Sequence, residues 1–298
     1  MTRQDFYKQK ENGIKSITDE KKLDYFQRLI TPYKKNGVSK TFISQYLEAD
    51  GNELSKKFWS VRSSSRFAFE LYSWMANDDR IKDICFEKKL KAIKGSNKKP
   101  NMDVYIEKDN RIIFIESKFS EIYPQSIQGL SDSYYLEKGE SQNSKTTISK
   151  RYYGRDDIAK AISNFVRKTK NQLEESGELS HCWMDFKQEI THLIGIVLTI
   201  VLDESKFFQN KDVEFYNIYY DFEDEVNSAI KDFFKNANDL MNHLLVDSQC
   251  CKSFTYDHFS AQDMVKDKRI ISFDPLTRAF ASEKTVGTLL NEYFNFKV

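Results

Sequence analysis

The chain has 298 residues, 40% hydrophobic and 14% aromatic, and this content predicts a packed globular protein rather than a disordered one. Its 46 basic and 45 acidic residues leave a net charge of +1, so any surface for a polyanion must be local. No apolar signal segment opens the sequence, and no later apolar run is long enough to span a bilayer. A cytoplasmic protein without a membrane partner is expected.

The four cysteines form no C-x-x-C pair, which argues against a structural zinc site or a redox motif and favours a reducing compartment. His243 and His258 flank the adjacent pair Cys250 and Cys251, but two neighbouring cysteines with long arms to each histidine are unusual zinc spacing. Packing is the better explanation for these residues.

The first sixty residues predict helices. Leu23, Phe26, Leu29 and Ile30 form one apolar stripe, and Pro32 ends it. The stretch 38–61 then predicts two short helices around a glycine turn, a pattern shared by DNA-reading helix-turn-helix units and plain helical hairpins.

A helix is expected over 65–78, after three serines that can cap its first turn. Its apolar face contains Phe67, Leu71 and Trp74. Glu70 lies three residues after Phe67 and four before Trp74, so it lies at the flank of the buried stripe. A carboxylate in that place is a candidate functional group.

Further along the chain, strands and helices alternate, as expected for an α/β protein. Strands are predicted at 84–90, 102–107, 112–118, 194–202 and 212–222, and helices at 156–175, 183–194, 222–245 and 284–294. The polar segment 119–150 predicts a long loop or small insertion.

The predicted hairpin around Asp109 and Asn110 has a register that follows from its turn. If these two residues form the turn, Lys108 faces Arg111, and the same register places Asp103 opposite Glu116. Glu116 and Lys118 are separated by one residue, so both point to one face of their strand.

Two opposed carboxylates repel each other in a partly buried place unless a positive group lies between them. Mg²⁺ takes oxygen ligands, usually one or two carboxylates, and keeps waters that can bridge to a phosphate. Asp103 and Glu116 therefore predict a magnesium site, with Lys118 beside it, whereas an ordinary solvated hairpin face is the structural alternative for a lone E-x-K.

One segment before the hairpin is strongly basic. Six lysines fall between positions 88 and 99 with no acidic residue among them. Such a run is either a solvated face or a surface for phosphate groups. Within it, Lys94, Lys98 and Lys99 are the candidates for contacts to a DNA backbone.

The order of Glu70, Asp103 and the ESK motif at Glu116–Lys118 resembles the PD-(D/E)XK superfamily of restriction endonucleases and related DNA-processing enzymes. In that family a helix with a frequent Glu precedes a hairpin carrying the Asp and the (D/E)xK, and a later helix and strand complete the core. The likeness covers about 63–220. Pro100 precedes Asp103 by three positions, a spacing that the family tolerates.

The resemblance implies a restriction-endonuclease-like core, a mixed central sheet flanked by helices. A helical region at 1–62 would precede this core at 63–220, and a helical region at 221–298 would follow it. It also implies a catalytic site of Asp103, Glu116, Lys118 and Glu70. Mg²⁺, or Mn²⁺ in its place, would be held by Asp103, Glu116, Glu70 and the backbone carbonyl of Ser117.

Some members of the family carry a Gln four residues before a Tyr on the helix after this strand, and Gln188 and His192 have that spacing in KQEITH. The pair would share a helix face near the metal or the DNA. The expected activity is endonucleolytic cleavage of double-stranded DNA in restriction or defence, with a second copy of the chain in a homodimer and a cognate methyltransferase as compatible partners. A repair exonuclease and an inactive nucleic-acid-binding or assembly module of the same fold are the alternatives.

Overall fold

The fold is taken from a computed structural model of the chain. It describes residues 26–35, 37–49, 54, 58, 63–118, 123–124, 126–127, 130–136, 142–175, 181–219 and 228–260.

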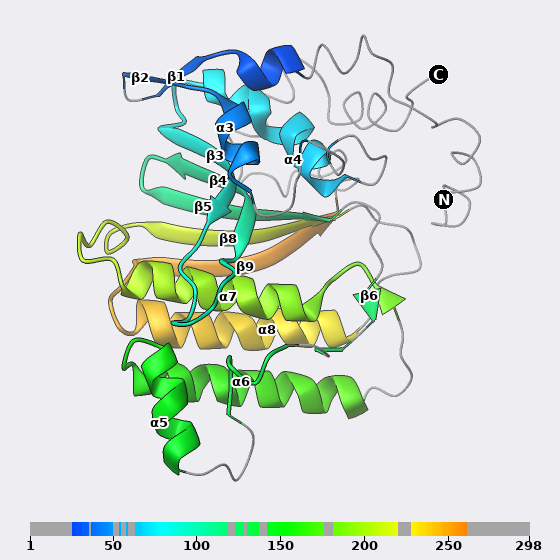
Figure 1. The fold of residues 1–298 in the computed structure, drawn as a ribbon, viewed down its shortest axis with the longest axis vertical. Helices are drawn as coiled ribbons and strands as arrows, with labels where there is room; N and C mark the ends of the chain where they lie inside the picture. Colours follow the sequence, from blue (N-terminus) through cyan, green and yellow to red (C-terminus); the bar gives the residue numbers. More distant parts are fainter. Residues whose placement is uncertain are drawn as a thin grey trace.

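A five-stranded mixed sheet forms the centre of this α/β protein (Figure 1). Its strands lie in the order β3-β4-β5-β8-β9; the first three are antiparallel, and β5, β8 and β9 run parallel to one another. The strands are β3 (Asp83–Lys89), β4 (Asn101–Lys108), β5 (Arg111–Lys118), β8 (Asp212–Tyr219) and β9 (Ser253–Ser260). The strands at 84–90, 102–107, 112–118 and 212–222 are thus confirmed within a residue or a few of their predicted ends.

Strand β5 lies in the middle of the sheet and is buried on both faces, which explains its apolar run before Glu116. Alternate side chains enter two separate cores. Ile113 and Ile115 pack with one core, and Ile112 and Phe114 pack with the other.

The first face of the sheet is covered by α3 (Phe42–Leu47) and α4 (Ser64–Tyr72), with a 3₁₀ turn at Ser73–Asn77 (Figure 1). The Ser63 hydroxyl caps α4 by accepting a hydrogen bond from the Arg66 amide at 3.0 Å, as predicted for this serine cluster. A small hairpin of β1 (Tyr33–Lys35) and β2 (Val38–Lys40) lies at the same end of the molecule.

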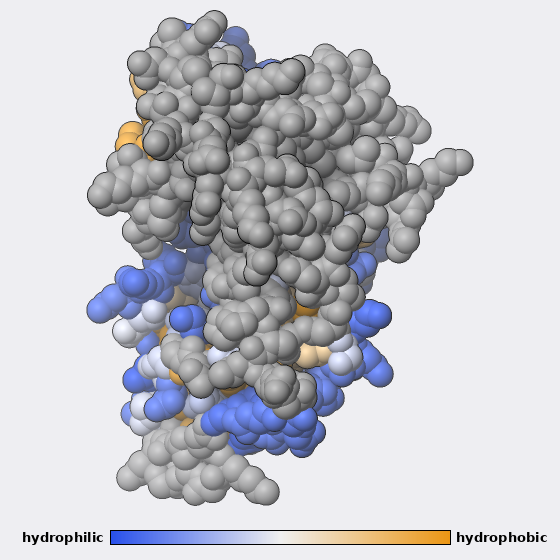
Figure 2. Space-filling model, turned by 90° about the vertical axis from the view of Figure 1, so that its right-hand side faces the viewer, coloured by the Kyte–Doolittle hydropathy of each residue, from blue (hydrophilic) through white to orange (hydrophobic). Residues whose placement is uncertain are grey.

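The second face is covered by α7 (Phe186–Val201) and α8 (Ser228–Met241), and α8 continues into a π-helical turn at Asn242–Val246. The outer layer contains α5 (Gln142–Arg151) and α6 (Asp156–Glu175), of which α6 packs on α8 (Figure 1). A two-residue ladder joins β6 (Tyr123–Pro124) to β7 (His181–Cys182). Figure 2 shows the molecule from the right-hand side of Figure 1. In its lower part, where the helical layer lies, the described surface is mostly hydrophilic.

The strand predicted at 194–202 is wrong, because this segment is the second half of α7. Helix α7 packs beside α8 in the apolar core on this face, and its buried residues include the unbroken run His192–Leu198, so the usual helical stripe disappears. A short apolar run is equally compatible with a buried strand and a buried helix until its neighbours are known.

Three other segments differ from the predicted elements. The first sixty residues contain the β1–β2 hairpin in addition to helices, and α5 lies in the segment expected to be a loop. Beyond position 220, β9 adds a strand to the central sheet. The second helix of the expected helix-turn-helix unit and the terminal helix at 284–294 lie outside the described residues. Within the described ranges, no helix is both long and apolar enough to cross a membrane.

Candidate functional site

The β4–β5 hairpin has the predicted register. Lys108 pairs with Arg111 and Glu107 with Ile112, and the ladder continues to Val104 and Ile115. One step further, Asp103 does not continue the ladder. Its carboxylate Oδ2 instead accepts a hydrogen bond from the backbone amide of Ser117 at 2.7 Å, which ties the start of β4 to the end of β5.

Glu116 and Lys118 lie side by side at the end of β5, with only 2% and 3% of each residue exposed. The Lys118 Nζ atom lies 2.8 Å from Glu116 Oε1. Gln188 of α7 joins both groups, since its Oε1 accepts from Lys118 Nζ and its Nε2 donates to Glu116 Oε1 at 2.9 Å. An ammonium, a carboxylate and an amide therefore form one buried network.

The start of α7 holds this network in place. Asp185 caps the helix by accepting a hydrogen bond from the Gln188 amide at 3.1 Å. One turn later, His192 Nδ1 lies 3.6 Å from Glu116 Oε2. Gln188 and His192 thus lie on one face of α7, as predicted from their spacing, and both approach Glu116.

Burial lowers the pKa of His192, so its imidazole is held in the neutral form at neutral pH. The ring also hydrogen-bonds to the backbone of Asn101. Among the described residues, neither His192 Nδ1 nor Glu116 Oε2 has a hydrogen-bond partner, although both atoms are buried. Two such acceptors close together are incomplete without a donor or a cation.

Negative charge is concentrated across three neighbouring strands. Burial raises the pKa of Asp103 well above its ordinary value, and Glu116 and Glu87 raise it further. The β3–β4 ladder pairs Phe86 with Val104 and Lys88 with Met102, and Glu87, between these pairs, is unpaired in the ladder and has a positive φ of 53°. Lys118 and the Ser117 amide act in the opposite direction. Carboxylates arranged in this way favour a bound cation.

Three further residues of this region were not predicted from the sequence. The fully buried carboxylate of Glu189 accepts hydrogen bonds at Oε2 from Asn217 Nδ2 at 3.0 Å and from the Tyr256 hydroxyl at 2.7 Å. Asn217 pairs with Glu116 in the parallel β5–β8 ladder. Burial, with a contribution from Glu116, raises the pKa of Glu189 to about 7.

A sequence signal for two of these residues existed. Glu189 is the acidic residue of a mostly apolar helix, and Asn217 interrupts an apolar and aromatic strand. Tyr256 carried no such signal, since tyrosines are common throughout the chain.

The other candidates lie on α4, on the loop after β3 and near the end of α8. Glu70 lies in α4, but its side chain is outside the described residues. Lys94, Lys98 and Lys99 are exposed on the loop between β3 and β4. His243 is exposed and forms an i,i+4 pair with Asp247.

A Mg²⁺ site needs oxygen ligands, usually one or two carboxylates together with waters. In the described part of the chain, no group of three or more His, Cys, Asp or Glu side chains is arranged to hold a metal ion. The donor chemistry nevertheless fits, because Asp103 and Glu116 supply carboxylate oxygens, and Glu116 Oε2 has no hydrogen-bond partner among the described residues.

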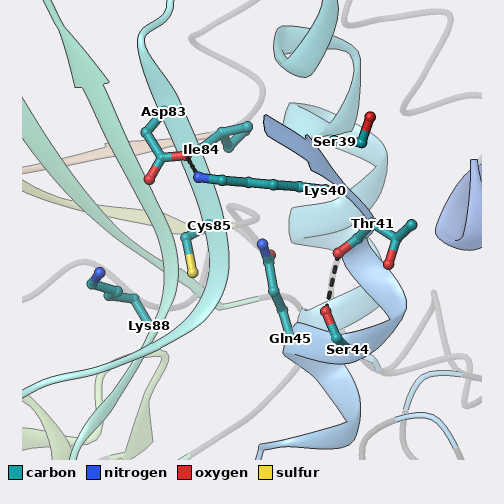
Figure 3. A pocket seen from close by; sticks show the side chains of 9 residues that line it. All are labelled: Ser39, Lys40, Thr41, Ser44, Gln45, Asp83, Ile84, Cys85 and Lys88. Atoms are coloured by element: carbon teal, nitrogen blue, oxygen red, sulfur yellow. Dashed lines mark hydrogen bonds and ion pairs between the residues drawn. The ribbon is translucent and has the colours of Figure 1, made fainter. Parts of the chain in front are cut away.

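A separate polar pocket of about 470 Å³ opens between α3 and strand β3 (Figure 3). Lys40 pairs with Asp83 across it, and Gln45 Oε1 accepts a hydrogen bond from the Phe86 amide, covering the edge of the sheet. Its lining is Ser39, Lys40, Thr41, Ser44, Gln45, Asp83, Ile84, Cys85 and Lys88. Burial raises the pKa of Cys85 to about 11, so its thiol is not an activated nucleophile.

No family model matches the chain, and no similar curated protein or solved structure is found.

Proposed function

We propose that this chain is a metal-dependent endodeoxyribonuclease of the PD-(D/E)XK kind, acting on DNA in restriction or defence. One observation carries the proposal. Asp103, Glu116 and Lys118 meet where β4 begins and β5 ends, and Gln188 of a later helix binds both Glu116 and Lys118. An accidental E-x-K motif on a solvated hairpin would not be buried and linked in this way.

The chain order of the elements supports the same reading. Helix α4 precedes the antiparallel strands β3, β4 and β5, and α7 then leads into β8, which pairs parallel to β5. This is the order of helix, hairpin, helix and strand that the resemblance implies.

In this proposal Asp103, Glu116 and the Ser117 carbonyl hold Mg²⁺ or Mn²⁺, and Glu70 adds a carboxylate from α4. The bound cation would lower the pKa of a water ligand and polarise a phosphoryl oxygen of the substrate. Lys118 orients the attacking water and stabilises the charge that develops on the phosphate.

Gln188 is a positioning residue in this scheme. Its amide holds the Lys118 ammonium and the Glu116 carboxylate at a fixed separation, and the Asp185 cap holds Gln188 itself. His192 takes the place of the family's Tyr and, as a neutral ring, approaches Glu116 without neutralising it. Such supporting partners usually change activity by roughly 10- to 100-fold when they are removed.

The test is cleavage of plasmid and phage DNA with Mg²⁺, with Mn²⁺ and with EDTA. Wild type should cut only with metal. Asp103→Ala, Glu116→Ala and Lys118→Ala should each abolish cleavage while DNA binding remains. Lys211→Ala is the matched control, because Lys211 forms a half-buried ion pair with Glu107 at 3.0 Å, away from the network.

A folded Lys118→Ala protein with wild-type cleavage would contradict the site assignment. The alternative of an inactive binding module is favoured by one contact, since the Lys118 ammonium already neutralises Glu116 without any metal. That alternative predicts DNA binding with no cleavage under any metal condition. Exonucleolytic action would instead appear as degradation from ends, with covalently closed plasmid left intact.

A further inference from the structure

Basic residues of the chain are unevenly distributed. The segments 88–101 and 142–155 together contain ten Lys and Arg residues and no acidic residue. Removing these ten from the 46 basic residues of the chain leaves 36 basic against 45 acidic, a net charge of −9 for the remainder. A mixed, solvated surface would not separate the charges in this way.

The fold brings these two segments together. The Lys94 amide donates a hydrogen bond to the Arg151 carbonyl at 2.9 Å, and the Tyr153 hydroxyl donates to the Ala92 carbonyl at 3.0 Å. Lys94 Nζ lies 4.9 Å from the centre of the Tyr153 ring. We call this the basic surface; its exposed members are Lys91, Lys94, Lys98, Lys99, Lys150 and Tyr153.

The loop of the basic surface is fixed at its base. Leu90 donates its amide hydrogen bond to the Pro100 carbonyl at 2.8 Å, and the Lys91 amide donates to Thr199 Oγ1 of α7 at 2.9 Å. At the tip, Gly95 adopts a φ of +82°, which glycine accommodates without strain. The lysines are thus presented by an ordered loop, which lowers the entropic cost of binding a ligand.

The same loop connects the basic surface to the candidate site. At one end the Asn101 backbone contacts His192, and at the other Lys91 contacts Thr199. These positions of α7 are separated by about 10 Å along the helix axis, at about 1.5 Å per residue. Duplex DNA carries one phosphate charge per about 1.7 Å of its axis, so several phosphates fit within this distance.

We propose that the basic surface binds the phosphate backbone of duplex DNA beside the cleavage position. This inference rests on the proposed function. It extends the expected DNA contact from the lysines of the β3–β4 loop to Tyr153 and the C-terminal end of α5. Contacts of this kind set the position of the duplex and carry no sequence information. The dipole of α5 also favours Lys150 and Arg151 at its last turn, but it does not explain the exposed lysines of the facing loop.

The test measures binding by the full chain in EDTA, so that cleavage plays no part. Fluorescence anisotropy of a labelled 24-base-pair duplex would be recorded over a series of salt concentrations. The variant carries Lys94→Glu, Lys98→Glu and Lys150→Glu. The control carries Lys206→Glu, Lys231→Glu and Lys235→Glu, three exposed lysines outside the basic surface, with the same change in net charge.

The variant should bind at least about tenfold more weakly than the control. Its slope of log affinity against log salt should fall by about 2 to 3, since each phosphate contact contributes about 0.9. Equal losses of DNA affinity in variant and control would overturn the proposal. It would also be overturned if wild type bound duplex RNA or anionic vesicles more strongly than duplex DNA and the variant lost that binding. A wild type that binds DNA through this surface but never cleaves it would support the phosphate-backbone contact and refute both the nuclease activity and the placement beside a cleavage position.

Discussion

At the scale of single residues, the site is defined by buried charges that do not balance. Asp103, Glu116 and Glu189 face one ammonium, that of Lys118, and His192 is neutral. Buried charges without partners are costly, so protons or a cation must complete the balance. Burial, with a further contribution from the Glu116 charge, raises the pKa of both Asp103 and Glu189.

The raised pKa of Glu189 makes a prediction about stability. Its pKa is about 7 in the folded protein against an ordinary value of 4.5, so the folded state binds more protons between these limits. The contribution of Glu189 to the free energy of unfolding should therefore be fully present below about pH 4.5 and be lost as the pH rises through about 7. Glu189→Gln should flatten this part of the curve of Tm against pH.

The measurement is thermal unfolding at closely spaced pH values in buffers of equal ionic strength. Glu204→Gln provides the matched control, because Glu204 is exposed and its substitution should leave the curve as in wild type. The same slope in Glu189→Gln and wild type would show that Glu189 is ionised throughout this range.

At the scale of elements, α7 positions both the candidate site and the basic surface. Its first half carries Gln188, Glu189 and His192 to the sheet, and its second half supports the loop of the basic surface. Gly195 lies at the crossing, where an added Cβ would meet Leu90 Cβ and Cδ1 at 3.0 Å and Pro100 Cγ at 3.2 Å. The absence of a side chain allows the loop to lie against the helix.

Gly195→Val should destabilise the protein by about 2 kcal/mol, because overfilling a packed contact costs about 1–3 kcal/mol. Urea unfolding would measure the change in the free energy of unfolding. Lys187→Val introduces the same side chain on the same helix at a half-exposed position and controls for helix propensity. Similar losses in both variants would mean that the loop yields to the new side chain at little cost.

At the scale of the whole molecule, the parallel strands β5, β8 and β9 end at the same edge of the sheet, where β4 begins. Asp103 on β4, Glu116 on β5 and Asn217 on β8 therefore lie near one another, although Asn217 is more than one hundred positions from each of the other two. Charge is also unevenly distributed over the whole molecule, because the two basic segments carry no acidic residue and the rest of the chain has a net negative charge.

A bound divalent cation should stabilise the folded chain. A ligand that binds only the folded state adds about 2.7 kcal/mol at one hundred times its Kd. Tm should thus rise with added MgCl₂ at constant ionic strength, and Asp103→Asn should remove most of this rise. Glu107→Gln, which changes a carboxylate at the opposite end of the hairpin, should retain it.

The outcome that contradicts this prediction is a Tm independent of Mg²⁺ and Mn²⁺ in the wild type. The buried network would then be a self-contained structural feature, with the Lys118 ammonium as the counter-charge of Glu116.

The sequence by itself determined the hairpin and its neighbours. Local geometry, which a short stretch of chain specifies, decides four of the predicted features. These are the hairpin register set by the turn at Asp109 and Asn110, the shared face of Glu116 and Lys118, the Ser63 cap, and the shared helix face of Gln188 and His192.

Only the tertiary structure decided what surrounds them. The helical state of 194–202 depends on burial between sheet and helices, and β9 depends on a partner strand distant in the sequence. Glu189, Asn217 and Tyr256 form one network because the fold brings three elements together, as it does for the two basic segments. Contacts between residues far apart in the chain leave no periodic pattern in the sequence, and this is the physical reason why they could not be predicted.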